Sequence, residues 1–364
     1  MKKTFSLIFI IVVLLSLSIA SACAGPSAQP GQIIKLTYSN FFPPTHLNSV
    51  LAQQWCDEIN AQTKGAVEIT YYPGGTLTPA PKVYDGVVTG ISDIGMSALA
   101  YSVGRFPASE VVDLPHEYPN GWVATQIAND FYNKFKPKEF DDTHVLYFHG
   151  HGPGIIFTTK KPVNVLEDMK GLVIRSTGVG AQIVEALGAK GYAAAQGEAY
   201  ELMSKGTIDG SFTPAEVLKG WKQAEVVKYV TNCYKVGNTT DFFVVMNNAK
   251  WDSLPNDVKN IFTKVSEEWI EKHAKVWSYY DKVAIDYFMT FPDRKVIELP
   301  DNEMSKWMDA VKPLIDKYVA DKTAKGLPAA DYEKYLQDRV KFWSGKSPSA
   351  ADCVNWVNEN LHPQ

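Results

Sequence analysis

The sequence has 364 residues and a formal net charge of −4 at pH 7, with 36 Lys and Arg residues against 40 Asp and Glu residues. No block of basic residues stands anywhere in the chain, so we expect no nucleic-acid partner. The length is sufficient for two domains, each with its own hydrophobic core.

The N-terminus predicts export. Two lysines precede an apolar run over 5–17 and small residues up to Ala22. The run is too short to span a bilayer comfortably, so it predicts a signal peptide over residues 1–22 and a periplasmic product. The residues around Cys23 also resemble a bacterial lipoprotein cleavage site, which would leave a lipid anchor on Cys23. Ordinary cleavage is the alternative, and the Pro-rich stretch 23–32 is predicted to be a linker.

Three further cysteines, Cys56, Cys233 and Cys353, match no metal-site spacing. In an oxidising compartment a Cys233–Cys353 disulfide would hold the end of the chain in place. Buried free thiols are the alternative, because sequence does not determine the geometry that a disulfide requires. We expect neither a bound metal nor a cofactor.

Hydrophobic periodicity predicts short strands that alternate with amphipathic helices. The first half is predicted to contain strand 33–39, helix 46–63, strand 67–72, helix 79–89, strand 94–97, helix 121–136 and strand 144–149. The second half is predicted to contain strand 172–175, helices 178–187 and 198–205, strand 208–212, helix 216–223, strand 241–246 and helix 256–288. This order predicts an α/β fold with a doubly wound sheet of parallel strands.

The segment 256–288 keeps a helical pattern without Gly or Pro. A helix of that length extends about 50 Å at 1.5 Å per residue. One small domain does not need such a length, so the pattern predicts a brace that runs along two domains.

Arg175 ends the apolar triplet 172–174 and is followed by a Ser/Thr/Gly loop. Its guanidinium keeps its charge, and its planar set of donors fits a carboxylate in two parallel hydrogen bonds. The position therefore indicates an organic-acid ligand. A structural ion pair is the alternative for an isolated arginine.

Several ordered segments carry a family resemblance. They are Val67-Glu-Ile-Thr-Tyr-Tyr-Pro-Gly-Gly-Thr-Leu77, Val87-Val-Thr-Gly-Ile-Ser-Asp-Ile-Gly95, the tract 106–115, 162–175, 198–210 and 251–255. From Ile33 to about Asn358 the chain resembles the extracytoplasmic solute-binding proteins of TRAP transporters, the DctP-like group. The resemblance implies a two-domain periplasmic-binding-protein fold with a hinge and a cleft. It also implies that the protein closes around a small organic acid and delivers it to TRAP membrane subunits.

The implied domains are discontinuous in sequence. Domain I is expected over 33–152 and 240–285, domain II over 153–239 and 286–345, and a C-terminal tail over 346–364. The crossings between the domains are expected near residues 150–154 and 238–241, where glycines would permit hinge bending.

The resemblance also places site residues. The family's arginine at this strand end pairs with the ligand's carboxylate, and Arg175 occupies that place. A second arginine of many relatives falls on Ile155 here, so a second carboxylate contact is not expected. Thr213 stands where some relatives have Asn, and Gln196 stands where some touch ligand or a metal ion.

Aromatic and polar residues follow strands whose ends should face the cleft, since ligands of open α/β sheets bind beyond the carboxyl ends of strands. These expected cleft residues are Asn40, Phe41, Phe42, Tyr101 and Phe212. Ordinary core or hinge packing is the alternative for about half of the aromatic ones. If two or three do face the cleft, they favour a monocarboxylate with an apolar or aromatic body. Asp241 would pair with an amino acid's ammonium group if it reaches the pocket, and is otherwise an exposed strand-end carboxylate.

Two functions outside transport stay open at this stage. His149 and His151 lie two residues apart on a strand, a spacing that can hold zinc in metal-dependent hydrolases, but only His273 and His362 follow. The alternative places both histidines at the crossing between domains, where they line the cleft and donate hydrogen bonds or only pack. No other catalytic motif stands in the chain, so we expect no enzyme. A ligand-sensing subunit of a signalling receptor would have a similar sequence.

Overall fold

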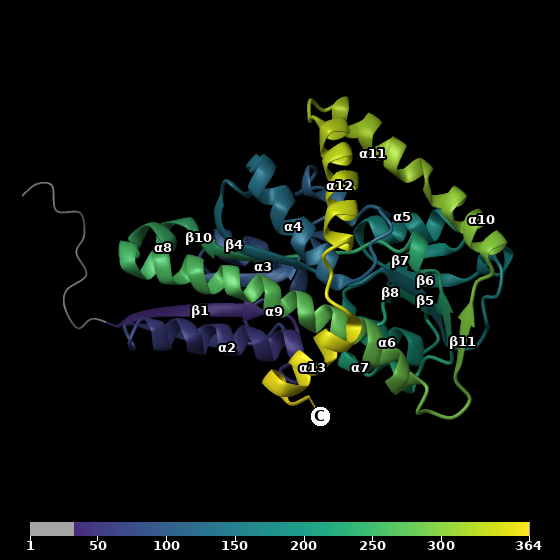
Figure 1. Cartoon of the computed structure of the whole chain (residues 1–364), viewed down its shortest axis with the longest axis horizontal. Helices are drawn as coiled ribbons and strands as arrows, with labels where there is room; N and C mark the ends of the chain where they lie inside the picture. The colour runs from purple at the N-terminus through teal and green to yellow at the C-terminus, as the bar shows by residue number, and fades with distance from the viewer. Residues whose placement is uncertain (1–32, 364) are drawn as a thin grey trace, which may run out of the picture.

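The protein folds into two lobes, each built on its own mixed β-sheet with flanking helices (Figure 1). The computed structural model describes residues 33–363. The predicted signal peptide, the linker and Cys23 all lie outside the described residues. The predicted α/β fold with two domains is confirmed.

Sheet A has the strand order β2-β1-β3-β10-β4. Its strands are β1 (Ile34–Asn40), β2 (Val67–Tyr72), β3 (Ile94–Ala98), β4 (Thr143–Gly150) and β10 (Asp241–Asn247). Strand β10 runs antiparallel to both β3 and β4. The chain reaches β10 from the other lobe. Strand β10 therefore begins at the edge of sheet A where β3 and β4 end.

Sheet B has the order β11-β9-β5-β8-β6-β7. Its strands are β5 (Gly154–Thr158), β6 (Val173–Ser176), β7 (Lys190–Ala193), β8 (Gly210–Pro214), β9 (Tyr229–Asn232) and β11 (Lys295–Glu298). Strand β5 follows the first crossing and runs antiparallel to β8 and β9. The prediction of purely parallel strands is therefore wrong for both sheets. Strands β5 and β10 run antiparallel because each enters its sheet directly from the other lobe.

The helices cover the sheets and join the lobes. They are α2 (Leu47–Gln62), α3 (Val83–Val88), α4 (Gly121–Phe135), α5 (Gly178–Ala186), α6 (Gln196–Ser204), α7 (Val217–Gly220), α8 (Asn248–Ser253), α9 (Asn256–Phe288), α10 (Asp301–Val311), α11 (Pro313–Thr323), α12 (Ala329–Ser344) and α13 (Ala350–Leu361). None of those within residues 33–363 combines the length and apolarity needed to cross a membrane.

Helix α9 is the long brace that the sequence predicts. It packs against α2, α4 and β4 of the sheet A lobe and against α7 of the sheet B lobe, as Figure 1 shows. Its buried residues include Trp269, Trp277 and Tyr280 at helical spacing. Burial of such large side chains along one stripe holds the helix against both lobes.

The C-terminal region differs from the expectation. Helix α12 packs against α4 of the sheet A lobe, although 286–345 was expected in domain II. The expected tail contains α13, which packs against α9. Cys353 and Val357 are buried in that contact, one helical turn apart, and Ser349 caps the helix by accepting from the Asp352 amide. An amphipathic helix with a capped start explains why this segment folds.

Cys56, Cys233 and Cys353 are all buried free thiols. Cys233 follows β9 in the sheet B lobe, whereas Cys353 lies on α13 against α9, so the disulfide between them is contradicted. Burial raises the pKa of Cys233 to about 12. A thiol with so high a pKa is a poor nucleophile at neutral pH, and its role is packing.

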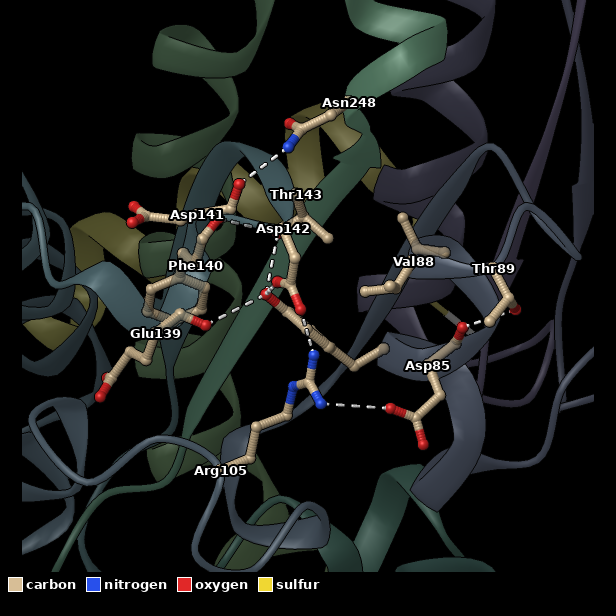
Figure 2. Close-up of polar contacts among 12 residues, drawn as sticks. Asp85, Val88, Thr89, Arg105, Glu139, Phe140, Asp141, Asp142, Thr143 and Asn248 are labelled. Atoms are coloured by element: carbon tan, nitrogen blue, oxygen red, sulfur yellow. Dashed lines mark hydrogen bonds and ion pairs between the residues drawn. The ribbon is translucent and has the colours of Figure 1, made fainter.

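A polar network ties the outer loops of the sheet A lobe together (Figure 2). Arg105 donates to Asp142 and lies 3.5 Å from Asp85. The Asn248 side chain donates to the Asp141 carbonyl at 2.9 Å. The carboxylates are exposed, so each ion pair contributes about 0–1 kcal/mol. Arg105 is thus an arginine with a structural role and two acidic partners.

Candidate functional site

A cavity lies between the two lobes, beyond the carboxyl ends of β1, β3, β6 and β8. Its lining comes from both lobes, both crossings and α9: Phe41, Phe42, Ala98, Tyr101, His151, Arg175, Ser176, Thr177, Gln196, Phe212, Thr213, Pro214, Glu216, Val217, Trp221, Asn238, Thr240, Phe242 and Trp277. The cavity measures about 40 Å³. An ordered water molecule needs ~10–15 Å³ of cavity volume, so the cavity has room for about three water molecules or one carboxylate group.

Arg175 is buried at the end of β6, with 3% of its surface exposed. Its Nε and Nη2 atoms donate to the Ala194 carbonyl at 3.0 and 2.8 Å, and Nη1 donates to Gln196 Oε1 at 2.7 Å. Within residues 33–363 it forms no ion pair with a carboxylate, so the structural ion pair considered above is contradicted. Burial lowers the pKa of Arg175 below its ordinary value. A buried guanidinium that no carboxylate contacts directly favours binding of an anion.

Two neighbours of Arg175 offer further donors. Gln196 turns Oε1 to the arginine, and its Nε2 is buried without a hydrogen-bond partner among the described residues. The Gln196 amide donates to the Tyr101 hydroxyl oxygen at 3.0 Å, which leaves the Tyr101 O–H free for another acceptor. Burial raises the pKa of Tyr101, so this hydroxyl stays protonated. Together the three side chains can donate to both oxygens of a carboxylate.

His151 presents an acceptor. Its Nδ1 lies 2.5 Å from the Gly152 carbonyl, which can only accept, so Nδ1 carries the proton. Burial and the nearby charge of Arg175 lower the pKa of His151 to about 4. The ring is therefore neutral at pH 7, and its Nε2 can accept a hydrogen bond.

A buried pair joins the two lobes beside the cavity. Glu216 lies after β8 and is 2% exposed; its Oε1 is 2.5 Å from His46 Nε2. His46 caps α2, and its Nδ1 accepts from the Asn48 amide at 3.2 Å. Gly220 makes room for this pair, because a Cβ there would lie 2.4 Å from Glu216 Oε1 and 2.7 Å from His46 Nε2.

Aromatic rings form the rest of the wall. Phe41 and Phe42 stack with centroids 4.4 Å apart, and Trp221 lies 6.1 Å from Phe41. Phe242 lies 6.1 Å from Phe41 as well, and it stacks on Trp277 at 5.3 Å. Offset stacks of this kind are rigid apolar surfaces that suit the body of an organic acid.

Most predicted site residues line this one cavity, and two do not. Arg175, Gln196, Thr213, Phe212, Tyr101, Phe41 and His151 are in the lining. Asn40 is fully buried at the end of β1, and its Oδ1 accepts from the Phe42 amide at 2.9 Å. It shapes the turn that presents the two phenylalanines and does not reach the cavity.

Asp241 is neither an exposed carboxylate nor a group in the cavity, so both expectations for it are wrong. It is 2% exposed, and its backbone amide donates to Asp113 Oδ1 at 2.9 Å. Burial raises the pKa of both carboxyl groups. The packing of β10 against Asp113 buries the side chain at the second crossing.

His149 does not combine with His151 in a metal site. Its Nδ1 accepts from the Trp277 indole at 3.0 Å, and its ring stacks on His273 at 4.3 Å. Across residues 33–363 no three His, Cys, Asp or Glu side chains are placed to hold a metal ion. His149 packs in the core of the sheet A lobe.

The buried, stacked rings of His149 and His273 predict that the free energy of unfolding depends on pH. Burial lowers the pKa of His273 to about 3. The unfolded chain binds this proton from pH 6.5 downward and the folded protein does not, so stability present above pH 6.5 is lost as the pH falls. We compare the free energies of unfolding of wild type and His273→Gln at each pH. Wild type minus variant should decrease by roughly 2–3 kcal/mol from pH 7 to pH 4. Urea unfolding at both pH values checks this, and parallel profiles would contradict it.

Sequence reasoning missed Glu216, Trp221, Phe242 and Trp277 as lining residues. The sequence pattern predicts Glu216 only as the start of a helix over 216–223, whereas α7 spans just 217–220. A carboxylate three residues after Thr213 was the one available signal. Trp277 lies within the regular pattern of α9 and carries no local sign of facing a cleft.

Two α/β lobes joined by crossings, with a cavity between them, define a two-domain solute-binding protein. The family model for bacterial extracellular solute-binding proteins, family 7, matches residues 38–322, and the chain belongs to this family. The resemblance to DctP-like TRAP solute-binding proteins is confirmed. The family consists of binding proteins, so the protein is not an enzyme.

The relatives agree on this class. A solute-binding protein from Albidiferax ferrireducens is 25% identical over 280 residues, 72% of this chain and 78% of the relative. A TRAP periplasmic solute binding protein from Desulfovibrio salexigens is 31% identical, covers 91% of this chain and 99% of its own, and has a TM-score of 0.76. A TRAP protein from Bordetella bronchiseptica with bound (R)- and (S)-mandelate is 27% identical, covers 85% and 99%, and has a TM-score of 0.79.

Proposed function

We propose that the protein captures a small organic acid in the periplasm through Arg175 and delivers it to the membrane subunits of a TRAP transporter. The observation that carries this proposal is the buried guanidinium of Arg175, which lies at the interlobe cavity without an acidic partner among the described residues. Gln196 and Tyr101 add donors beside it. A carboxylate would satisfy all three groups at once.

The ligand is a monocarboxylate with an apolar body, which an aromatic ring would fit. Arg175 is the one Arg or Lys in the lining formed by residues 33–363. Ile155, where many relatives have a second arginine, lies in β5 beside Thr213. The aromatic wall supports this class, as does the mandelate bound by the Bordetella relative. Because the cavity holds little more than a carboxylate as it stands, a larger body requires the lobes to part.

The crossings at 151–153 and 233–240 supply the hinge. The ligand's carboxylate meets Arg175 on the sheet B lobe, and Phe41 and Tyr101 of the sheet A lobe then cover its body. Only contacts that the closed state adds can stabilise closure. Domain I over 33–152 and 240–285, with domain II over 153–239 and the strand β11, is the division that goes with this motion. Export depends on residues 1–22, with a lipid anchor on Cys23 as the alternative to free release.

Mass spectrometry of small molecules released from the purified, denatured protein tests the proposal. We expect an acid with one carboxylate and a mass below roughly 250 Da, in keeping with the small cavity. Isothermal titration calorimetry of the folded protein with that compound should then show one binding site per chain. A neutral sugar or a phosphate ester as the co-purifying compound would contradict the assignment.

A further inference from the structure

We propose that the ligand carries a hydrogen-bond donor, a hydroxyl or an ammonium group, close to its carboxylate, and that Glu216 recognises this donor. The inference deepens the proposed function and rests on it, since it takes the contact between Arg175 and the ligand's carboxylate as given.

Glu216 has a buried carboxyl group that lines the cavity, and some of its acceptor positions have no hydrogen-bond donor among the described residues. Its side chain makes one hydrogen bond within residues 33–363, from His46 to Oε1. A carboxylate offers about four acceptor positions on two oxygens. Oε2 and the second lone pair of Oε1 are therefore left to accept from a bound molecule.

His46 fixes the direction in which Glu216 accepts. The Asn48 amide donates to His46 Nδ1, so in the neutral ring Nε2 carries the proton and donates to Glu216. The imidazole is fully buried and stacks on Phe42 with centroids 4.3 Å apart. His46 is thus a positioning residue, which holds the carboxyl of Glu216 at the cavity from the opposite lobe.

The lining of the cavity contains both donors and acceptors. Arg175, Gln196 and Tyr101 have N–H or O–H groups to donate. Glu216 and the neutral His151, whose lowered pKa leaves Nε2 as an acceptor, lie in the same lining. An acid with no second polar group would leave these acceptors buried and unsatisfied, at a cost of about 1–3 kcal/mol.

Charge leads to the same class of ligand. A plain monocarboxylate would bring a second negative group into a cavity that already contains Glu216, with one guanidinium to balance both. A zwitterion adds no net charge. A hydroxy acid brings the same charge as the plain acid, but its hydroxyl group donates a hydrogen bond to the glutamate. Buried charges without partners are strongly unfavourable, so ligands with a donor are favoured over those without one.

Two matched series of acids test the inference by calorimetry. Propionate, lactate and alanine differ at C2 by hydrogen, hydroxyl and ammonium, as do phenylacetate, mandelate and phenylglycine. In each series that binds, we expect the best donor-bearing acid to bind roughly 5–150-fold more tightly than the plain acid. Equal or tighter binding of the plain acids would overturn the inference and leave the proposed function standing. Failure of all six acids and of the co-purified compound to bind would overturn both.

Glu216→Gln identifies the recognising residue. The glutamine oxygen still accepts from His46 Nε2, so the fold is kept, but the charge is lost. The preference for an ammonium acid over the plain acid should fall at least ~5-fold, and that for a hydroxy acid should fall by less. Glu201→Gln on the exposed face of α6 is the matched control and should change nothing. An unchanged preference in Glu216→Gln would show that Glu216 does not read the donor.

Discussion

Replacing Arg175 with alanine should weaken binding of the organic-acid ligand by at least ~30-fold, since loss of one partner of a buried charge pair costs about 2–5 kcal/mol. The ligand-free protein should keep its melting temperature within a few degrees. The substitution leaves the Ala194 carbonyl without its donors, but it also removes a buried charge that has no acidic partner in residues 33–363. Calorimetry and thermal unfolding of the same preparation measure both effects.

Arg175→Lys is the matched control for charge without the planar fork. Lysine cannot donate to Ala194 and Gln196 and also grip both carboxylate oxygens. We therefore expect an affinity between those of wild type and Arg175→Ala. Arg105→Ala, at the exposed network of Figure 2, should leave affinity unchanged. An Arg175→Ala variant that binds normally would refute the anchor, and one that unfolds would mean that the arginine is structural.

Gly210→Ala should have the largest effect on stability. A Cβ on Gly210 would lie 1.8 Å from the Phe157 carbonyl oxygen of β5, and a backbone atom cannot move aside as a flexible side chain does. Strand β8 lies between β5 and β6, so its displacement also disturbs Ser211, the register partner of Arg175. We expect a loss of at least ~3 kcal/mol in the free energy of unfolding. Urea unfolding measures it.

Gly197→Ala is the control for glycine replacement. The nearest side-chain atom to a Cβ there is 3.9 Å away, on Trp221, and the position is helical in α6. Alanine should be neutral or stabilise by up to about 1 kcal/mol. Similar stabilities of the Gly210 and Gly197 variants would show that sheet B tolerates displacement of β8.

The parts of the site that follow from local pattern could be predicted from the sequence. Arg175 ends an apolar strand, and the loops after β1 and β3 present Phe41 and Tyr101, as expected for strand ends. The long helix was also predictable, because more than nine turns keep one period. Such features depend on neighbours in sequence.

The parts that depend on distant contacts could not be predicted. His46 and Glu216 meet across 170 positions, and nothing local to either residue indicates the other. Asp241 was expected at the surface, but the packing of β10 against Asp113 buries it. The antiparallel direction of β5 and β10 follows from the way the chain crosses between lobes. Each of these is a tertiary effect that overrides the local pattern.

A crystal structure of the protein with its co-purified or best-binding acid would show directly whether Arg175 holds the ligand. We expect one carboxylate between the lobes, with both oxygens within about 3.2 Å of donors on Arg175, Gln196 or Tyr101. A ligand whose carboxylate points away from Arg175, or an acid bound outside the interlobe cavity, would contradict it.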